Sequence, residues 1–147
     1  MGYKVVNVEN NNKASGTAVG VGYPFNKTAV FGKTFTTIDK AATNLKCLLL
    51  TRKGERYIQP EFGTDLLFLI FEPNVGELKD EIITTISEPV EYWLPYIILT
   101  ELIVTTLDDD PTMLHNVKVT IGFTVAGLID NSKITIFADE NGILQVE

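Results

Sequence analysis

The chain has little of the chemistry on which most small enzymes depend. Its 147 residues include one cysteine, Cys47, and one histidine, His115. A single cysteine excludes an intramolecular disulfide and a cysteine-based zinc site, and a single histidine excludes a histidine cluster around a metal. Gly16, Gly20 and Gly22 lack the lysine and the strand–turn–helix context of a phosphate-binding loop. These absences predict a protein with no metal and no cofactor.

Long apolar segments are also missing. The longest apolar run covers residues 66–71, far short of the roughly 18 residues that a membrane span needs. The first residues are polar and do not form the apolar core of a signal peptide, so we expect neither membrane insertion nor secretion. The apolar fraction of 45% excludes wholesale disorder, and the length suits a single domain over residues 1–147.

Basic residues are scarce in the second part of the chain. Residues 1–60 carry nine Lys or Arg and three Asp or Glu, a charge of +6, whereas residues 61–147 carry three and sixteen, a charge of −13. The resulting net charge of −7 argues against nucleic acid as a partner, because phosphate binding needs a concentrated basic surface. Either the two parts pair their charges internally, or opposite-signed faces guide assembly with neighbouring subunits.

The first third of the chain predicts an extended arm and then a helix. Residues 1–32 are polar or glycine-rich, and we expect them to form an arm with little core of its own. The helix begins at Thr36 or Thr37, because Asp39 stands three residues after Thr36 as in a capping box. It ends near Thr51, and Gly54 is free to take a left-handed cap.

Two further helices complete the helical part, residues 33–96. A short helix over residues 64–71 is apolar almost all round, and Asp65 is placed to cap it. The next helix starts after Asn74 and ends at Pro95. Pro89 lies inside this helix and predicts a kink or break, because proline has no amide to donate to the preceding turn.

A period of two residues predicts strands from residue 97 onward. We expect a buried strand over residues 97–107, a strictly alternating strand over 117–125 and a third over 133–138. An Asn-Gly turn at 139–142 then returns the chain as a fourth strand. The predicted fold class is α+β: an antiparallel meander of about four strands, residues 97–147, with two or three helices on one face and the extended N-terminal arm.

The search for catalytic residues leaves one weak candidate pair. Glu61 and Asp65 lie four residues apart, and two carboxylates are the catalytic groups of glycoside hydrolases. A serine triad would need His115, but no nucleophile elbow surrounds any serine. Asp108–Asp110 lacks the ligand spacing of a calcium loop and is typical of a solvated turn. We therefore expect no catalytic residues.

One motif is distinctive. Thr51-x-x-Gly54-Glu55-Arg56, then Pro60-Glu61-Phe62-Gly63, then Phe71-Glu72-Pro73 resembles the baseplate wedge and sheath-initiator family of contractile phage tails. That family also supplies a baseplate component of type VI secretion systems. An upstream Gly22-Tyr23-Pro24-Phe25 segment is similar to one in many members. The residues on which we base the resemblance are Arg52, Gly54, Arg56, Pro60, Glu61, Phe62, Gly63 and Asp65.

The resemblance implies a structural protein and not an enzyme. It implies a component of the virion, present in several copies in the tail baseplate and assembled in the host cytoplasm. The implied partners are the sheath protein, other wedge proteins and the tail tube or tube-initiator proteins. Members offer sheet edges to the first sheath ring, so that sheath assembly starts there.

The resemblance also implies a contact with the wedge core bundle, through a Glu-Pro-Arg motif at the end of the long helix. Here that position is Leu94-Pro95-Tyr96, and only the proline is kept. Trp93 and Tyr96 offer aromatic burial in place of an ion pair, so the predicted partner-binding residues are Trp93, Leu94, Pro95 and Tyr96. Some members are labelled lysozymes, so the alternative function is a glycoside hydrolase acting on peptidoglycan through Glu61 and Asp65.

Overall fold

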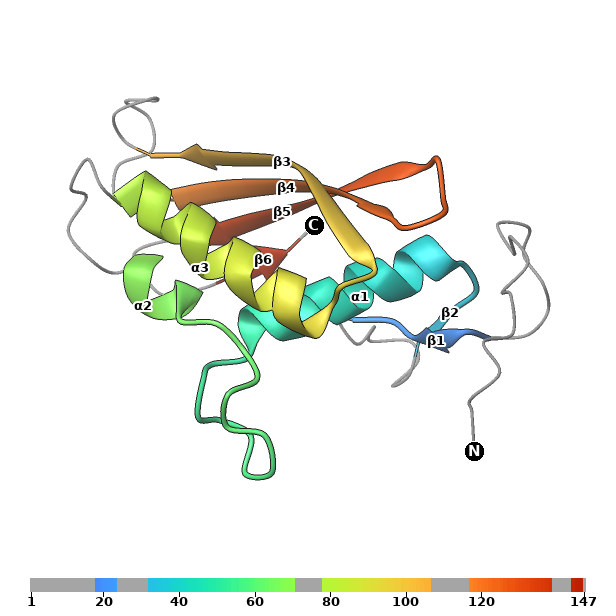
Figure 1. Cartoon of the computed structure of the whole chain (residues 1–147), viewed down its shortest axis with the longest axis horizontal. Helices are drawn as coiled ribbons and strands as arrows, with labels where there is room; N and C mark the ends of the chain where they lie inside the picture. The colour runs from blue at the N-terminus through green and yellow to red at the C-terminus, as the bar shows by residue number, and fades with distance from the viewer. Residues whose placement is uncertain (1–17, 24–31, 71–77, 107–116, 139–143, 147) are drawn as a thin grey trace.

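The computed structural model describes residues 18–23, 32–70, 78–106, 117–138 and 144–146. Figure 1 shows a sheet crossed by helices, which confirms the α+β class and the antiparallel meander. The elements in chain order are β1 (Gly20–Val21), β2 (Lys33–Thr34), α1 (Thr37–Leu50), α2 (Leu66–Ile70), α3 (Leu78–Trp93), β3 (Ile97–Thr105), β4 (Val117–Val125), β5 (Asn131–Ala138) and β6 (Leu144–Val146).

The larger sheet has the strand order β3-β4-β5-β6, and every neighbouring pair is antiparallel. Its register places Leu102 beside Ile121 and Ile121 beside Ile134. These residues share one face because side chains alternate along a strand. A β-bulge shifts the register between Leu99 and Glu101 in β3.

The core lies between that face and the helices. On β4 the residues predicted to alternate inward are buried, and Phe123 is among the largest fully buried side chains. One cluster joins these strand residues to the apolar stripes of the three helices. The opposite face of the sheet is more polar, and there Lys133 Nζ lies 2.7 Å from Glu101 Oε2.

The limits of α1 follow the predicted capping signals. The Asp39 amide donates to Thr36 Oγ1 at 3.1 Å, which confirms Thr36 as the N-cap. Thr51 caps the other end, where its amide donates to the Cys47 carbonyl oxygen at 3.2 Å. The predicted left-handed cap at Gly54 is wrong in position, because Thr51 ends the helix in an extended conformation. Gly54 has a φ of 85° but serves the loop that follows.

Two other expectations fail for tertiary reasons. Of the kink or break predicted at Pro89, the break is wrong, since α3 continues through this residue to Trp93. Pro89 and Val90 are buried there, and this packing offsets the one hydrogen bond that proline cannot make. The strand predicted as buried is half exposed: Ile98 and Ile103 of β3 face solvent because they pair with Thr124 and Thr120 on the sheet face opposite the core.

A two-stranded sheet beside α1 joins β1, from the predicted N-terminal arm, to β2, which directly follows that arm. β1 and β2 pair antiparallel, and the Val19 amide donates to the Thr34 carbonyl oxygen at 2.8 Å. The predictions for the rest of the arm, the cap at Asn74, His115, the 108–110 turn and the 139–142 turn lie outside the described residues. The division of one domain into arm, helical part and sheet stays a prediction.

Candidate functional site

The distinctive motif builds a loop, residues 51–65, that joins α1 to α2 and projects from the body of the molecule (Figure 1). The loop is closed by its own backbone. The Gly54 amide donates to the Pro60 carbonyl oxygen at 2.6 Å, and the Arg52 amide donates to Glu55 Oε2 at 3.1 Å. The signature residues therefore hold a compact loop in one conformation, as in other hydrogen-bonded surface loops.

The base of the loop is anchored at Gly63 and Thr64. The Thr64 amide donates to the Thr51 carbonyl oxygen at 2.9 Å, and the buried Thr64 hydroxyl donates to the Leu49 carbonyl oxygen at 2.8 Å. Gly63 has a φ of 123°, and its backbone packs directly on Thr51 with no room for a Cβ. Glycine is required at this position by both its conformation and the close approach of the two chain segments.

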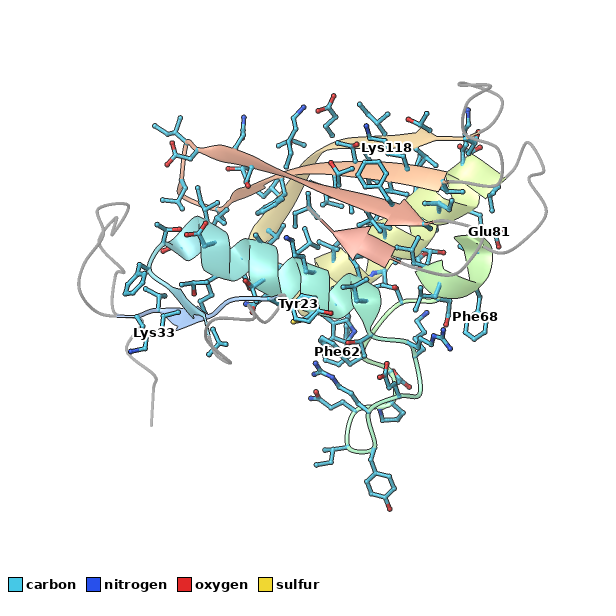
Figure 2. The ribbon with its side chains drawn as sticks, turned by 180° about the vertical axis from the view of Figure 1, so that it is seen from behind. Tyr23, Lys33, Phe62, Phe68, Glu81 and Lys118 are labelled. Atoms are coloured by element: carbon cyan, nitrogen blue, oxygen red, sulfur yellow. The ribbon has the colours of Figure 1, made fainter. Side chains whose placement is uncertain are left out.

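An aromatic stack connects this loop to the end of α3. The Arg56 guanidinium lies 3.6 Å from the centre of the Phe62 ring. The Phe62 ring meets Trp93 edge-on at 5.2 Å, and Trp93 meets Tyr92 at 5.0 Å. Figure 2 shows Phe62 at the base of the projecting loop. The structure thus brings together two sets of residues that the sequence suggested separately, the loop motif and Trp93.

An open groove of about 620 Å³ lies between the loop and α3. Four of the eight residues that line it are prolines or aromatic residues, and three are charged. Its lining consists of Lys53, Pro60, Glu61, Gly63, Glu88, Pro89, Tyr92 and Trp93. A shallow groove of aromatic side chains and prolines favours a protein segment as ligand, since such surfaces supply large contact area at little entropic cost.

The predicted partner-binding residues do not all face outward. Leu94 is only 8% exposed and belongs to the core, whereas Pro95 is exposed. Trp93 is half-buried against Phe62. Tyr96 is partly exposed, and its hydroxyl accepts a hydrogen bond from Asn44 Nδ2 at 2.7 Å. Trp93, Pro95 and Tyr96 are therefore the members of the set with accessible surface.

Two exposed groups were missed by reasoning from the sequence. Tyr92 is 75% exposed beside Trp93, and Tyr57 and Ile58 at the loop tip are 100% and 91% exposed. The signal for the tip was present, because two large apolar residues stand together in a polar loop bounded by Gly54 and Pro60.

A second groove, of about 580 Å³, runs between α3 and the edge strand β3. Val90 and Glu91 line it from the helix, and Ile97, Ile98 and Leu99 line it from the strand. Ile98 is 51% exposed. The start of β3 therefore combines an open strand edge with an adjacent cavity of mainly apolar lining.

The two candidate catalytic carboxylates have different surroundings. Glu61 is exposed on the groove, while the Asp65 carboxylate lies 3.4 Å from Lys53 Nζ. Asp65 stands directly before α2, and its backbone oxygen accepts the Phe68 amide at 2.9 Å, as that of an N-cap residue does. Both side chains are accessible to solvent, and that of Asp65 is 46% exposed.

The described residues were also searched for a metal site, a reactive thiol and a membrane-spanning helix. No three His, Cys, Asp or Glu side chains there gather closely enough to hold a metal ion. Burial raises the pKa of the Cys47 thiol, and the nearby positive charge of Arg56 acts in the opposite direction. No helix in the described part of the chain is both long and apolar enough to cross a membrane.

Comparison with known proteins identifies the assembly. The family model of the baseplate wedge protein gp25 matches residues 39–132, and the chain belongs to this family of structural baseplate proteins. The matched span includes most of α1, the loop, α2, α3 and the strands β3 and β4. The chain is therefore a component of a phage tail or related baseplate, with other baseplate proteins as its partners.

Two solved structures share the fold. One is the baseplate of the anti-feeding prophage, in which a chain matches with a TM-score of 0.60 and 22% identity over 74% of this chain and 86% of that one. The other is a candidate tail lysozyme from Geobacter sulfurreducens, with a TM-score of 0.58 and 18% identity over 68% of this chain and 87% of that one. No curated protein sequence matches the chain.

Proposed function

We propose that this protein initiates sheath assembly from the baseplate wedge of a contractile phage tail. In this proposal residues 1–147 act as one wedge domain. The sheet offers a free edge to sheath subunits, and the end of α3 docks on the core bundle of the wedge near the tail tube. The observation that carries the proposal is the open edge of β3 in a chain of the baseplate wedge family.

The edge of β3 is suited to receive a strand. It is nine residues long, and in the described part of the chain it pairs on one side only, with β4. An added strand gains affinity from main-chain hydrogen bonds and gains register from pockets for alternate side chains. The groove lined by Val90 and Ile98 supplies such a pocket. The bulge near Thr100 confines regular pairing, which limits self-association before sheath arrives.

The end of α3 is proposed to dock through side chains and not through strand pairing. Trp93, Pro95 and Tyr96 offer partly exposed surface where the family carries its ion-pairing motif. Aromatic residues are enriched among those that dominate binding energy, so they substitute for the missing charges. Leu94 contributes from inside the core by fixing the position of its neighbours.

The β3 edge is tested by an Ile98→Lys variant, because a lysine on a strand edge opposes addition of another strand. We expect the variant to melt within about 2 °C of wild type, since Ile98 is half exposed. Baseplates that contain it should carry no sheath or few sheaths in negative-stain electron microscopy. Ile129→Lys, at a position 97% exposed in the connection between β4 and β5, is the matched control.

The other edge strand is tested by truncation after Asp139, which removes β6. If the truncated protein nucleates sheath of normal length and the Ile98→Lys variant does not, β3 is the docking edge and β6 is not. Normal sheath on baseplates of both variants would refute the proposed use of the sheet edges.

A further inference from the structure

We infer that the groove between the loop and α3 binds an arginine side chain from a neighbouring protein of the assembly. The guanidinium stacks on Tyr92 and pairs with the Glu88 carboxylate, and Glu91 adds negative charge beside it. The inference rests on the proposed docking of the end of α3, and it names the chemistry of the partner, which that proposal leaves open.

The first support is the arrangement of one aromatic ring and two carboxylates on the surface of α3. Glu88 lies four residues before Tyr92 and three before Glu91. Residues with these spacings are neighbours on a helix surface. All three are exposed, and Tyr92 is 75% exposed, so most of its ring is available for contact. Glu88 and Tyr92 both line the open groove of about 620 Å³.

The loop side of this groove carries no net charge. Residues 51–65 contain three bases and three acids, which are Arg52, Lys53, Arg56, Glu55, Glu61 and Asp65. Lys53 lines the groove, and its ammonium lies 3.4 Å from the Asp65 carboxylate. The charge that a ligand meets in the groove is therefore decided by α3.

The α3 side is acidic and is not compensated. Residues 80–93 carry four carboxylates and no Lys or Arg. Neither Glu88 nor Glu91 forms an ion pair within the described part of the chain. Outside that part, Lys and Arg occur only within residues 1–31, so residues 71–77, which directly precede α3, supply no base. An interface with a neighbouring protein gains specificity when a positive group meets such a surface.

The polarity of the helix adds to this negative charge. Glu91 stands in the last turn of α3 and Glu88 one turn earlier, and the last turn contains no basic residue. A helix carries about half a negative charge at its C-terminal end, where carboxylates are unfavourable and cations are stabilising. A cation from a partner offsets both the carboxylates and the helix end, so this position favours a positively charged ligand.

The aromatic ring beside the carboxylates selects arginine over lysine. A guanidinium is planar, stacks on aromatic rings and forms two parallel hydrogen bonds with one carboxylate, whereas an ammonium acts as a compact point charge. The chain already contains a contact of this kind, because the Arg56 guanidinium lies 3.6 Å from the centre of the Phe62 ring. Tyr92 is linked to Phe62 through Trp93, so a partner's arginine on Tyr92 extends the same aromatic stack.

The inference is tested by the double variant Glu88→Lys with Glu91→Lys, in the full chain co-expressed with the other baseplate proteins. Lysines here repel an incoming arginine, so incorporation into purified baseplates should fall by about tenfold or more. The isolated variant should melt no lower than wild type, because both positions are exposed and lysines suit the negative end of a helix. Normal incorporation of this variant would overturn the inference.

Asp80→Lys with Glu81→Lys is the matched control. It changes the net charge by the same amount, at two exposed positions in the first turn of the same helix. This control should incorporate normally, although lysines are disfavoured at the positive end of a helix. An equal loss of incorporation in both double variants would show that the effect follows overall charge and not the groove, which contradicts the inference.

The partner is identified by placing the photo-crosslinking amino acid benzoylphenylalanine at position 92 and mapping the cross-link in assembled baseplates by mass spectrometry. The inference expects cross-links to one segment of another protein that contains an arginine. Changing that arginine to glutamate should restore incorporation of the chain with Glu88→Lys and Glu91→Lys. Cross-links to a segment without arginine, cross-links to residues 1–31 of the same chain, or a failure to restore incorporation would each overturn the inference.

The inference and the proposed docking of α3 fail in different ways. Tyr96→Ala removes aromatic surface at the end of α3 and leaves Glu88 and Glu91 in place. If Tyr96→Ala lowers incorporation and the double lysine variant does not, the end of α3 docks without an arginine, and only the inference fails. If neither change lowers incorporation, the proposed docking of α3 fails as well.

Discussion

Replacement of Gly63 by alanine is predicted to be among the most damaging single-methyl changes in the protein. A Cβ at this position would overlap the Thr51 carbonyl oxygen and stand 2.9 Å from its carbon. The φ of 123° also disfavours any side chain. Left-handed strain costs about 1–2 kcal/mol. Displacing Thr51 weakens the hydrogen bond from the Thr64 amide and costs about 1–2 kcal/mol more, so the free energy of unfolding should fall by roughly 3 kcal/mol in total.

Gly54→Ala is the matched control. Gly54 also has a positive φ, of 85°, but no atom lies within 4 Å of the position that its Cβ would take. The Gly54→Ala variant should therefore lose only the free energy of backbone strain, about 1–2 kcal/mol of stability. For a chain of this length each kcal/mol lowers the melting temperature by about 2–4 °C. We expect losses of about 6–12 °C for Gly63→Ala and about 2–8 °C for Gly54→Ala.

The melting temperature of each variant is measured by calorimetry, and its free energy of unfolding by urea titration followed by circular dichroism. The slopes of the free energy against urea concentration are compared, because equal slopes show that both variants expose the same surface on unfolding. The reasoning is refuted if Gly63→Ala melts within about 2 °C of Gly54→Ala, because the close approach of residues 51 and 63 would then add no measurable cost.

The remaining predictions concern Cys47 and the two loop carboxylates. Because burial raises the pKa of the Cys47 thiol in the folded chain, its contribution to stability is complete below the pKa of the unfolded thiol and is lost as pH rises through the folded pKa. The melting temperature of wild type relative to Cys47→Ser should therefore fall as the pH rises above about 8.5, the ordinary pKa of a free thiol, and a constant difference would contradict this account. Glu61→Gln and Asp65→Asn should leave baseplate assembly largely intact, with at most about 1 kcal/mol lost from the half-exposed pair of Asp65 with Lys53. Clearing of peptidoglycan by the wild-type protein, absent in both variants, would favour the glycoside hydrolase instead.

Local signals in the sequence predict those features that depend on neighbouring residues. The Thr36 cap, the end of α1 near Thr51 and the alternation along β4 are of this kind, because capping and side-chain period act within one turn or one strand. The same holds for the short helix α2 and for the end of α3 before Pro95.

Features that depend on position in the assembled sheet are not predicted. The predicted meander already places residues 97–105 at an edge, but their nearly continuous apolar sequence hides that Ile98 and Ile103 lie on the solvent face of the sheet. Helix continuation through Pro89 likewise depends on the packing of that turn. Leu94 was grouped with Trp93 because the two are adjacent in a motif, but adjacent helical residues point in different directions, and Leu94 points into the core.

Ordering the tip of the loop costs conformational entropy that burial of apolar surface does not offset. Ordering the residues at its tip costs roughly 1–2 kcal/mol each in backbone entropy, and Tyr57 and Ile58 bury almost no apolar surface in return. Gly63, Thr64 and the Arg56–Phe62 stack nevertheless hold the tip in place. Folding alone gains nothing from a fixed, exposed Tyr-Ile pair. An ordered, exposed segment of this kind loses little further conformational entropy on association.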